Sequence, residues 1–505
     1  MKRLRSILIE LLQGIAVILL FIALSHCDAR CQDVLGYFLS GSPADRMTGG
    51  NIFSGTPEFK PLSLPSAEMM HPVAGYEYRF DNLYKEELAD GDVNQAQRYS
   101  RAFSLSLPLQ YGMFSPVLDL SVISTSAGTR IAQDSGEAGD YASRNNVVNL
   151  SYAMRLSSAI SISADVSSLS DGNHSFTNGN AMVTFDLGPR SAISFRTGNI
   201  GSFNLLQLTI TGVDGVLPLH IQKSGFAFAG QTALERLSLA FSFEQSSLLS
   251  VPDVTEENNT RFLPQGTLLE AVTGARYDLR DNVSLMIGGK YVQATGAAKF
   301  LSGSSSYGNL SSFGFNSAEV HAGVRYGTTA SRFITGDLQW QRLSGGLRGY
   351  VESWPFVSIF DALVSSRENF GAAGSLEYLK VHLGGTFPMS DNITIGLGNN
   401  LLHAMPSLTV ETWQPKYIIF GVRAYDKKEL DIRSLDLMIA SAGMKMRLGG
   451  YILTYSINQF VPLHIDKGET ASGSGSAPSQ PGTGTTQTLK TSGGQFHQLS
   501  VVYEF

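Results

Sequence analysis

The stretch NVVNLSYAMRL, residues 146–156, alternates strictly between apolar residues and small or polar ones. Such alternation places one set of residues on each face of a β-strand. The same two-residue period recurs at 98–109, 116–124, 160–167, 181–187, 234–244, 267–278, 283–291, 316–326, 331–340, 376–385, 392–401, 434–448 and 451–457. The sequence therefore predicts an all-β fold made of many short strands.

The second face of these strands is poor in charge. It carries mainly Ser, Gly, Ala, Thr and Asn, and only 16% of the 505 residues are charged, against roughly 25% in soluble globular proteins. A soluble sheet would show water a face rich in Lys and Glu. A small, mildly polar face suits the wall of a lumen, with the apolar face turned to lipid.

The predicted connections are short and long in turn. Short turns are expected at 157–158, 188–190, 280–282, 328–330 and 390–392, and long polar loops at 81–97, 127–144, 245–266, 296–315, 342–370 and 461–494. This is the pattern of outer-membrane barrels. Lipid does not tolerate open sheet edges, so the sheet must close. We predict a transmembrane antiparallel β-barrel of 14 to 18 strands.

The N-terminal region has two parts. Lys2, Arg3 and Arg5 precede an apolar run at 11–24, which predicts a signal peptide over residues 1–31, with lipidation at Cys27 as a weaker alternative. Residues 32–71 hold several Pro and Gly and little alternation. We expect them to form a plug, or hatch, inside a barrel of residues 72–505; a loose periplasmic tail is the alternative.

The C-terminal sequence QFHQLSVVYEF carries apolar residues at every second position up to the final aromatic residue: Leu499, Val501, Tyr503 and Phe505. It resembles the sorting signal read by the outer-membrane insertion machinery. With the signal peptide, it predicts export to the outer membrane of a Gram-negative-type bacterium. The expected partners are outer-membrane lipid and, during biogenesis, that machinery.

The sequence contains no motif for catalysis. HExxH, GxSxG, CxxC and the phosphate-binding GxxxxGK[ST] are all absent, so we expect neither an enzyme nor a cofactor. The acidic run at 90–94 lacks the later Gly and Glu of a calcium loop, and no metal site is predicted. His321 and His382 fall on inward strand positions and are expected to add polarity to the lumen. The net charge of −6 and the lack of a basic face exclude nucleic acid as a partner.

The predicted loop at 342–370 is unusually apolar. It holds four candidate ligand-binding residues: Trp354, Phe356, Ile359 and Phe360. Exposed loops seldom carry so large an apolar patch, which favours an external site that captures an apolar ligand; a short helix packing over the barrel mouth is the alternative. Phe226 and Phe228 are candidates for the same surface or for an aromatic girdle.

The segment ADRMTGG (44–50) resembles the Gly-rich hatch of the FadL/TodX family, whose members transport hydrophobic compounds. LPSA (64–67) lies where that family carries Asn-Pro-Ala, with Leu64 in place of Asn. The hairpins at 274–292 and 383–401 are similar to family hairpins but are generic to outer-membrane barrels. The resemblance implies a 14-stranded barrel and these hatch residues: Arg46, Met47, Gly49, Gly50 and Pro65.

Three functions stay open. The first is passive, hatch-gated uptake of hydrophobic small molecules, fatty-acid-like or aromatic, through the outer membrane. The second is a structural or interaction barrel in a surface secretion or assembly complex, and the third is a weakly selective porin. Low lumen charge favours the first over an ion-selective pore, which needs rings of charge.

Overall fold

The computed structural model describes residues 73–87, 93–110, 117–132, 139–157, 159–170, 175–188, 191–198, 205–208, 217–250, 260–302, 305–329, 332–352, 367–413, 425–429, 432–467 and 495–504. The signal peptide, the hatch segment with its five named residues, the apolar loop residues at 354–360 and Phe505 lie outside these ranges. Every element of the described part is a β-strand, as the alternation predicts. No helix in that part is long and apolar enough to cross a membrane.

The 20 strands follow one another along the chain with these bounds: β1 Val73–Glu87, β2 Val93–Gln110, β3 Val117–Ala132, β4 Gly139–Arg155, β5 Ile160–Ser170, β6 Ser175–Gly188, β7 Ser191–Gly198, β8 Leu205–Leu208, β9 Leu217–Leu234, β10 Leu237–Ser250, β11 Thr260–Arg280, β12 Val283–Ser302, β13 Ser305–Thr329, β14 Arg332–Glu352, β15 Arg367–Ser390, β16 Ile393–Trp413, β17 Tyr425–Glu429, β18 Ile432–Leu448, β19 Tyr451–Lys467 and β20 Gln495–Glu504.

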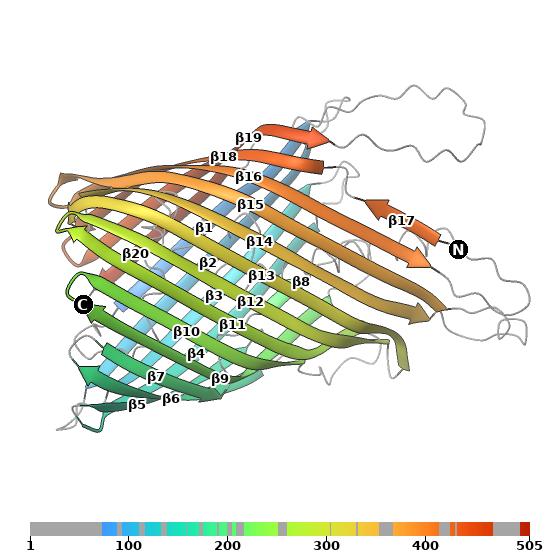
Figure 1. Cartoon of the computed structure of the whole chain (residues 1–505), viewed down its shortest axis with the longest axis horizontal. Coiled ribbons are helices and arrows are strands. Elements are labelled where there is room, and N and C mark those ends of the chain that lie inside the picture. Colours follow the sequence, from blue (N-terminus) through green and yellow to red (C-terminus); the bar gives the residue numbers. More distant parts are fainter. Residues whose placement is uncertain are drawn as a thin grey trace, which may run out of the picture.

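Pairing is antiparallel and runs from each strand to the next. β7 pairs with β9, and β16 pairs with β18, so the short strands β8 and β17 are side partners of β9 and β16. β1 pairs with β2 on one side and with β20 on the other, with Val73 opposite Glu504. The succession of pairings therefore returns to its first strand. In Figure 1 the yellow to orange strands cross in front of the blue and cyan strands β1–β4.

Leaving out the side strands β8 and β17, the succession holds 18 of the 20 strands. The prediction of 14 strands is wrong, although 18 lies at the upper limit of the expected range. Several strands also reach far into stretches predicted as loops. Residues 296–315 show this best, because β12 continues to Ser302 and β13 begins at Ser305. The Gly and Ser of this stretch indicate a loop in isolation, yet the same small residues fit a barrel wall.

The two ends of the sheet differ as predicted. Hairpins such as β11–β12, β15–β16 and β18–β19 join their strands through two residues at one end. The start of β1 and the end of β20 lie at that same end, since Tyr503 is opposite Tyr451, the first residue after a short turn. Glu235, in the β9–β10 turn, has a φ of +34° and Gly449, in the β18–β19 turn, has a φ of +62°, as tight hairpin turns require.

The outer surface of the sheet is apolar. In β4, Val148, Leu150 and Tyr152 are 42%, 44% and 38% exposed, whereas the next residue, Ala153, is buried. Large exposed apolar residues follow the same alternation across the sheet, among them Phe195, Phe241, Ile287, Val324, Leu338, Leu383, Leu397 and Tyr451. The predicted division of each strand into two faces is confirmed, and the larger apolar side chains occupy the outer face.

Candidate functional site on the inner wall

The inner face of β12–β20 carries polar side chains that are almost completely buried. Thr335, Asn400 and Ser456 have no exposed surface, and His382 and Asn458 are 1% exposed. Burying a polar group is costly unless it is hydrogen-bonded. These buried polar residues are therefore candidates for a structural or functional role.

Ion pairs also lie on the inner wall. Asp337 Oδ2 lies 2.6 Å from His382 Nδ1, and both side chains are fully buried. Their positions follow from register, since Asp337 of β14 is directly opposite His382 of β15. Lys290 of β12 lies 3.2 Å from Glu270 of β11. His321 is buried as well, and its Nδ1 lies 3.4 Å from Glu319 Oε1.

The structure places both histidines on the inner face, as predicted. Arg325, four residues after His321 in β13, stacks on the ring of Phe333, with its guanidinium carbon 4.3 Å from the ring centroid. Sequence reasoning had no means of finding the partners of the histidines, because Asp337 is 45 residues from His382 along the chain. Only the register of β14 against β15 brings them together.

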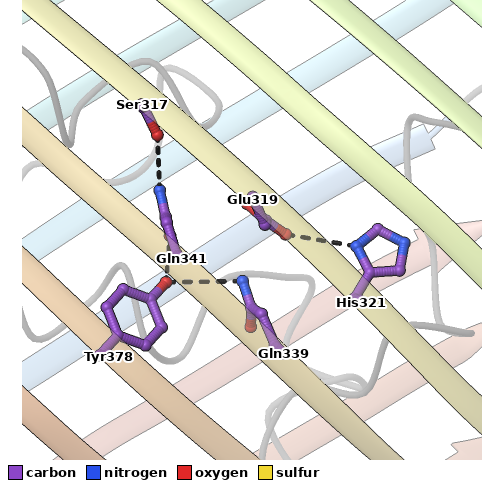
Figure 2. Close-up of polar contacts among 6 residues, drawn as sticks. All are labelled: Ser317, Glu319, His321, Gln339, Gln341 and Tyr378. Carbon is purple, nitrogen blue, oxygen red and sulfur yellow. Dashed lines mark hydrogen bonds and ion pairs between the residues drawn. The ribbon is translucent and has the colours of Figure 1, made fainter.

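Hydrogen bonds join four side chains of three neighbouring strands into a chain (Figure 2). Gln341 donates to Ser317 Oγ at 2.9 Å and accepts a hydrogen bond from the hydroxyl of Tyr378. The same hydroxyl accepts a long hydrogen bond of 3.5 Å from Gln339. These bonds offset the cost of burying the groups and fix the positions of β13, β14 and β15 relative to one another.

Gly288 provides the space for the buried ring of His321. The two residues are directly opposite each other in β12 and β13. A Cβ on Gly288 would lie 2.3 Å from His321 Nε2 and 2.8 Å from Cε1, which is far inside van der Waals contact. Glycine at this position therefore lets the imidazole lie flat against the neighbouring strand.

An apolar belt continues the inner wall toward the end with the longer connections. We define this inner apolar belt by its buried members: Leu268, Val292, Ala294, Phe315, Leu343, Tyr378, Leu402, Ala404, Ile439 and Phe460. Leu343 is completely buried, and Leu268, Tyr378 and Ile439 are 1% exposed. Tyr378 lies at the boundary, with its ring in the belt and its hydroxyl in the hydrogen-bonded chain.

The expectation of a uniformly small and polar inner face is thus wrong in this region. The belt does correspond to a pattern in the sequence, namely two apolar residues in succession, but alternation alone does not show which of the two faces inward. Leu401 and Leu402 are neighbours, but Leu401 is 47% exposed outside and Leu402 is 3% exposed inside. Where both faces of a strand are apolar, the two-residue period disappears. Adjacent apolar residues such as Leu401 and Leu402 then indicate the belt.

Phe226 and Phe228 lie on the outer wall and not in the lumen. Phe228 is 4.9 Å from Phe195 and 5.2 Å from Phe241, measured between ring centroids. Phe226 lies 6.3 Å from Phe243 and is 49% exposed. Their position matches the alternative of an aromatic girdle.

The alternating residues of the C-terminal strand lie on the outer side of β20. Tyr503 packs against Tyr451 with 4.6 Å between ring centroids. Leu499 and Val501 are opposite Tyr78 and Tyr76 of β1, respectively. The strand that carries the expected sorting signal is therefore also the strand that joins the end of the chain to its beginning.

The residues described by the structure contain no group of three or more metal-ligating side chains. What the inner wall offers is a polar zone of paired side chains beside a buried apolar belt. Such a combination can hold an apolar molecule that carries a small polar group.

No family model matches this chain, and no curated protein matches it. Among solved structures, it is similar to a BenF-like porin from Pseudomonas fluorescens Pf-5, with 8% identity and a TM-score of 0.41 over 86% of this chain and 98% of that one. Acinetobacter baumannii OccAB4 gives 9% identity and a TM-score of 0.33 over the same shares. A deletion mutant of the TodX monoaromatic hydrocarbon channel gives 11% identity and a TM-score of 0.34 over 93% of this chain and 99% of that one. A TM-score below 0.5 establishes no shared fold, and these likenesses assign no substrate to this chain.

Proposed function

We propose that this chain is an outer-membrane β-barrel through which hydrophobic small molecules enter the cell by passive diffusion. The observation that carries the proposal is the inner apolar belt, where Leu343, Leu402 and Ile439 are at most 3% exposed. A pore for ions or sugars is lined by polar groups and charges. An apolar wall instead favours an apolar molecule, because contact with it removes apolar surface from water.

The outer wall supports placement in a membrane. Ile287, Leu383 and Leu397 are 57%, 63% and 53% exposed on the outer face. Soluble proteins seldom expose apolar surface over such an area. The strands β11–β16 have 20 to 25 residues, more than the 9 to 11 that a tilted strand needs to cross the hydrocarbon core.

Burial of the inner wall supports a hatch. About eight strands enclose an interior that side chains alone can fill, whereas 16 to 18 strands leave a wide channel. Part of the inner face is nevertheless buried, with Thr335, Asn400 and Leu343 at 0% exposure. We infer that residues 32–71 form the hatch that covers it and that moves to let a ligand pass.

The test is uptake by proteoliposomes. Wild-type protein should admit naphthalene faster than protein-free liposomes do, and should not admit sucrose. Leu343→Asn places a polar amide in the belt, while Leu338→Ala changes an outward residue of the same strand that is 48% exposed. Loss of the contact of one leucine is worth about 1.5 kcal/mol or more, so Leu343→Asn should reduce naphthalene uptake by about tenfold and Leu338→Ala should not.

Folding of each variant is checked by the shift of the band on unheated gels. Uptake of sucrose at the rate of naphthalene would contradict the proposal and favour a porin. Uptake of neither compound would favour the structural or interaction barrel.

A further inference from the structure

We infer that the inner wall holds a specific site for the hydroxyl group of an apolar alcohol or phenol, formed by Asp337 and Lys380. The inference rests on the proposed uptake of hydrophobic compounds and names their class. Its basis is a carboxylate oxygen and an ammonium group that belong to buried, diagonally neighbouring residues and for which the described part of the chain provides no hydrogen-bond partner.

Only one of the two oxygens of the Asp337 carboxylate forms a hydrogen bond to a described residue. Asp337 Oδ2 is bonded to His382 Nδ1 at 2.6 Å, but Asp337 Oδ1 has no hydrogen-bond partner among the residues that the structure describes, although the side chain is completely buried. A buried acceptor left without a donor costs about 1 to 3 kcal/mol, and more when it is charged. A ligand that donates a hydrogen bond to Oδ1 would recover this cost.

Lys380 lies on the same inner face, at the inward-facing position of β15 next to His382. Lys380 precedes His382 by two residues in β15, so it is the diagonal neighbour of Asp337 across the β14–β15 pair. Lys380 is 6% exposed and interacts electrostatically with Asp337 and Glu319. Within the described part of the chain it forms no hydrogen bond or ion pair.

Several other polar groups of this wall have partners. Lys290 is paired with Glu270, His321 with Glu319, and Tyr378 with Gln341. Buried oxygens of Thr386, Ser441, Ser456 and Asn458 also have no hydrogen-bond partner in the described part of the chain, but they belong to neutral groups. Asp337 differs from them because its free oxygen belongs to a carboxylate and Lys380 is its diagonal neighbour.

The charges favour a neutral ligand group. An anion would gain Lys380 but would meet the carboxylates of Asp337 and Glu319, and a cation would meet Lys380. A hydroxyl group donates one hydrogen bond and accepts others, and its oxygen can lie about 2.7 Å from each partner. A hydroxyl group between the two side chains would therefore donate to Oδ1 of Asp337 and accept from the ammonium group of Lys380.

The apolar belt begins beside this pair. Lys380 is directly opposite Leu402, and Tyr378, two residues away, is opposite Ala404. Leu402, Ala404 and the ring of Tyr378 are all members of the belt. A ligand whose hydroxyl group lies between Asp337 and Lys380 would thus place its apolar body on the belt.

The test measures binding of four compounds to the full chain in detergent: 2-naphthol, 2-methoxynaphthalene, naphthalene and 2-naphthoate. The methoxy compound keeps the oxygen acceptor but has lost the donor. A hydrogen bond to a charged group is strong enough that 2-naphthol should bind at least about tenfold more tightly than the other three. Equal affinity of naphthol and its methyl ether, or tightest binding of naphthoate, would overturn the inference.

A variant supplies the second measurement. Lys380→Met keeps the length of the side chain and removes the ammonium group, and it should cut the preference for naphthol over naphthalene to about threefold or less. Lys445→Met, an exposed lysine on the same face of β18, should leave the preference unchanged. If Lys380→Met fails to fold, the comparison of naphthol with its methyl ether on wild-type protein still decides.

Failure of this inference is distinct from failure of the proposed function. Naphthalene that binds as well as naphthol overturns the hydroxyl site alone, whereas naphthalene that does not bind at all contradicts uptake of hydrophobic compounds.

Discussion

The contact between Gly288 and His321 gives the sharpest prediction for stability. In Gly288→Ala, the new methyl group would lie 2.3 Å from His321 Nε2, 2.8 Å from Cε1 and 3.1 Å from the carbonyl oxygen of Thr273. The imidazole cannot move far, because its side chain is 1% exposed and its Nδ1 lies near Glu319. Overpacking of this kind costs about 1 to 3 kcal/mol, against about 0.5 to 1 kcal/mol gained on replacing a strand glycine by alanine. The net loss relative to wild type is then about 0 to 2.5 kcal/mol, and the loss relative to an alanine substitution that meets no neighbour is about 1 to 3 kcal/mol.

The matched control is Gly314→Ala in β13, where a Cβ would have no atom within 4 Å. This variant should be as stable as wild type or slightly more stable. The assay is urea unfolding in detergent micelles, followed by tryptophan fluorescence, with the free energy of unfolding taken from the midpoint and slope. If Gly288→Ala were as stable as Gly314→Ala, the register that places Gly288 opposite His321 would be wrong.

Two further predictions test the closure of the sheet and its outer wall. In a protein with both native cysteines replaced by serine, Gly75→Cys with Val502→Cys should form a disulfide, because these residues are opposite each other in β1 and β20 and paired strand residues lie within disulfide range. Gly75→Cys with Gln498→Cys, four positions out of register, should stay unlinked on non-reducing gels after proteolysis between β19 and β20; equal linkage of both pairs would contradict the closure. Ile287→Arg places a charge on the outer face at a residue that is 57% exposed and should cost up to about 2 to 4 kcal/mol if that face meets lipid, measured as lost assembly into liposomes. Asp281→Arg, in the exposed turn before β12, should assemble normally, and normal assembly of Ile287→Arg would show that the outer face meets water.

The sequence was sufficient for the strands and their two faces. Alternation in 146–156 predicts that Val148, Leu150 and Tyr152 share a face, and these residues are exposed on the outside. It was not sufficient for the strand ends. Gly and Ser at 296–315 favour a loop locally, but pairing with neighbouring strands outweighs this weak local preference.

The inner wall could be predicted only in part. Inward positions for His321 and His382 follow from counting residues along one strand. The pairing of His382 with Asp337 depends on the register between β14 and β15, which are joined by a long connection. The alternation of residues within each strand does not fix this register. The belt was missed for a different reason: at Leu401 and Leu402 both faces of the strand are apolar, and periodicity cannot assign such residues to a face.

The most direct test of a gated apolar channel is the ion conductance of the full chain in planar bilayers, beside a variant that lacks residues 32–71. Leu343 and Asn400 of the inner wall are completely buried. If the proposed hatch covers them, the full chain should conduct no steady current, and removal of residues 32–71 should open large, steady currents. Large currents of equal size from both proteins would contradict the account, because they would show that the lumen of the full chain is open and filled with water.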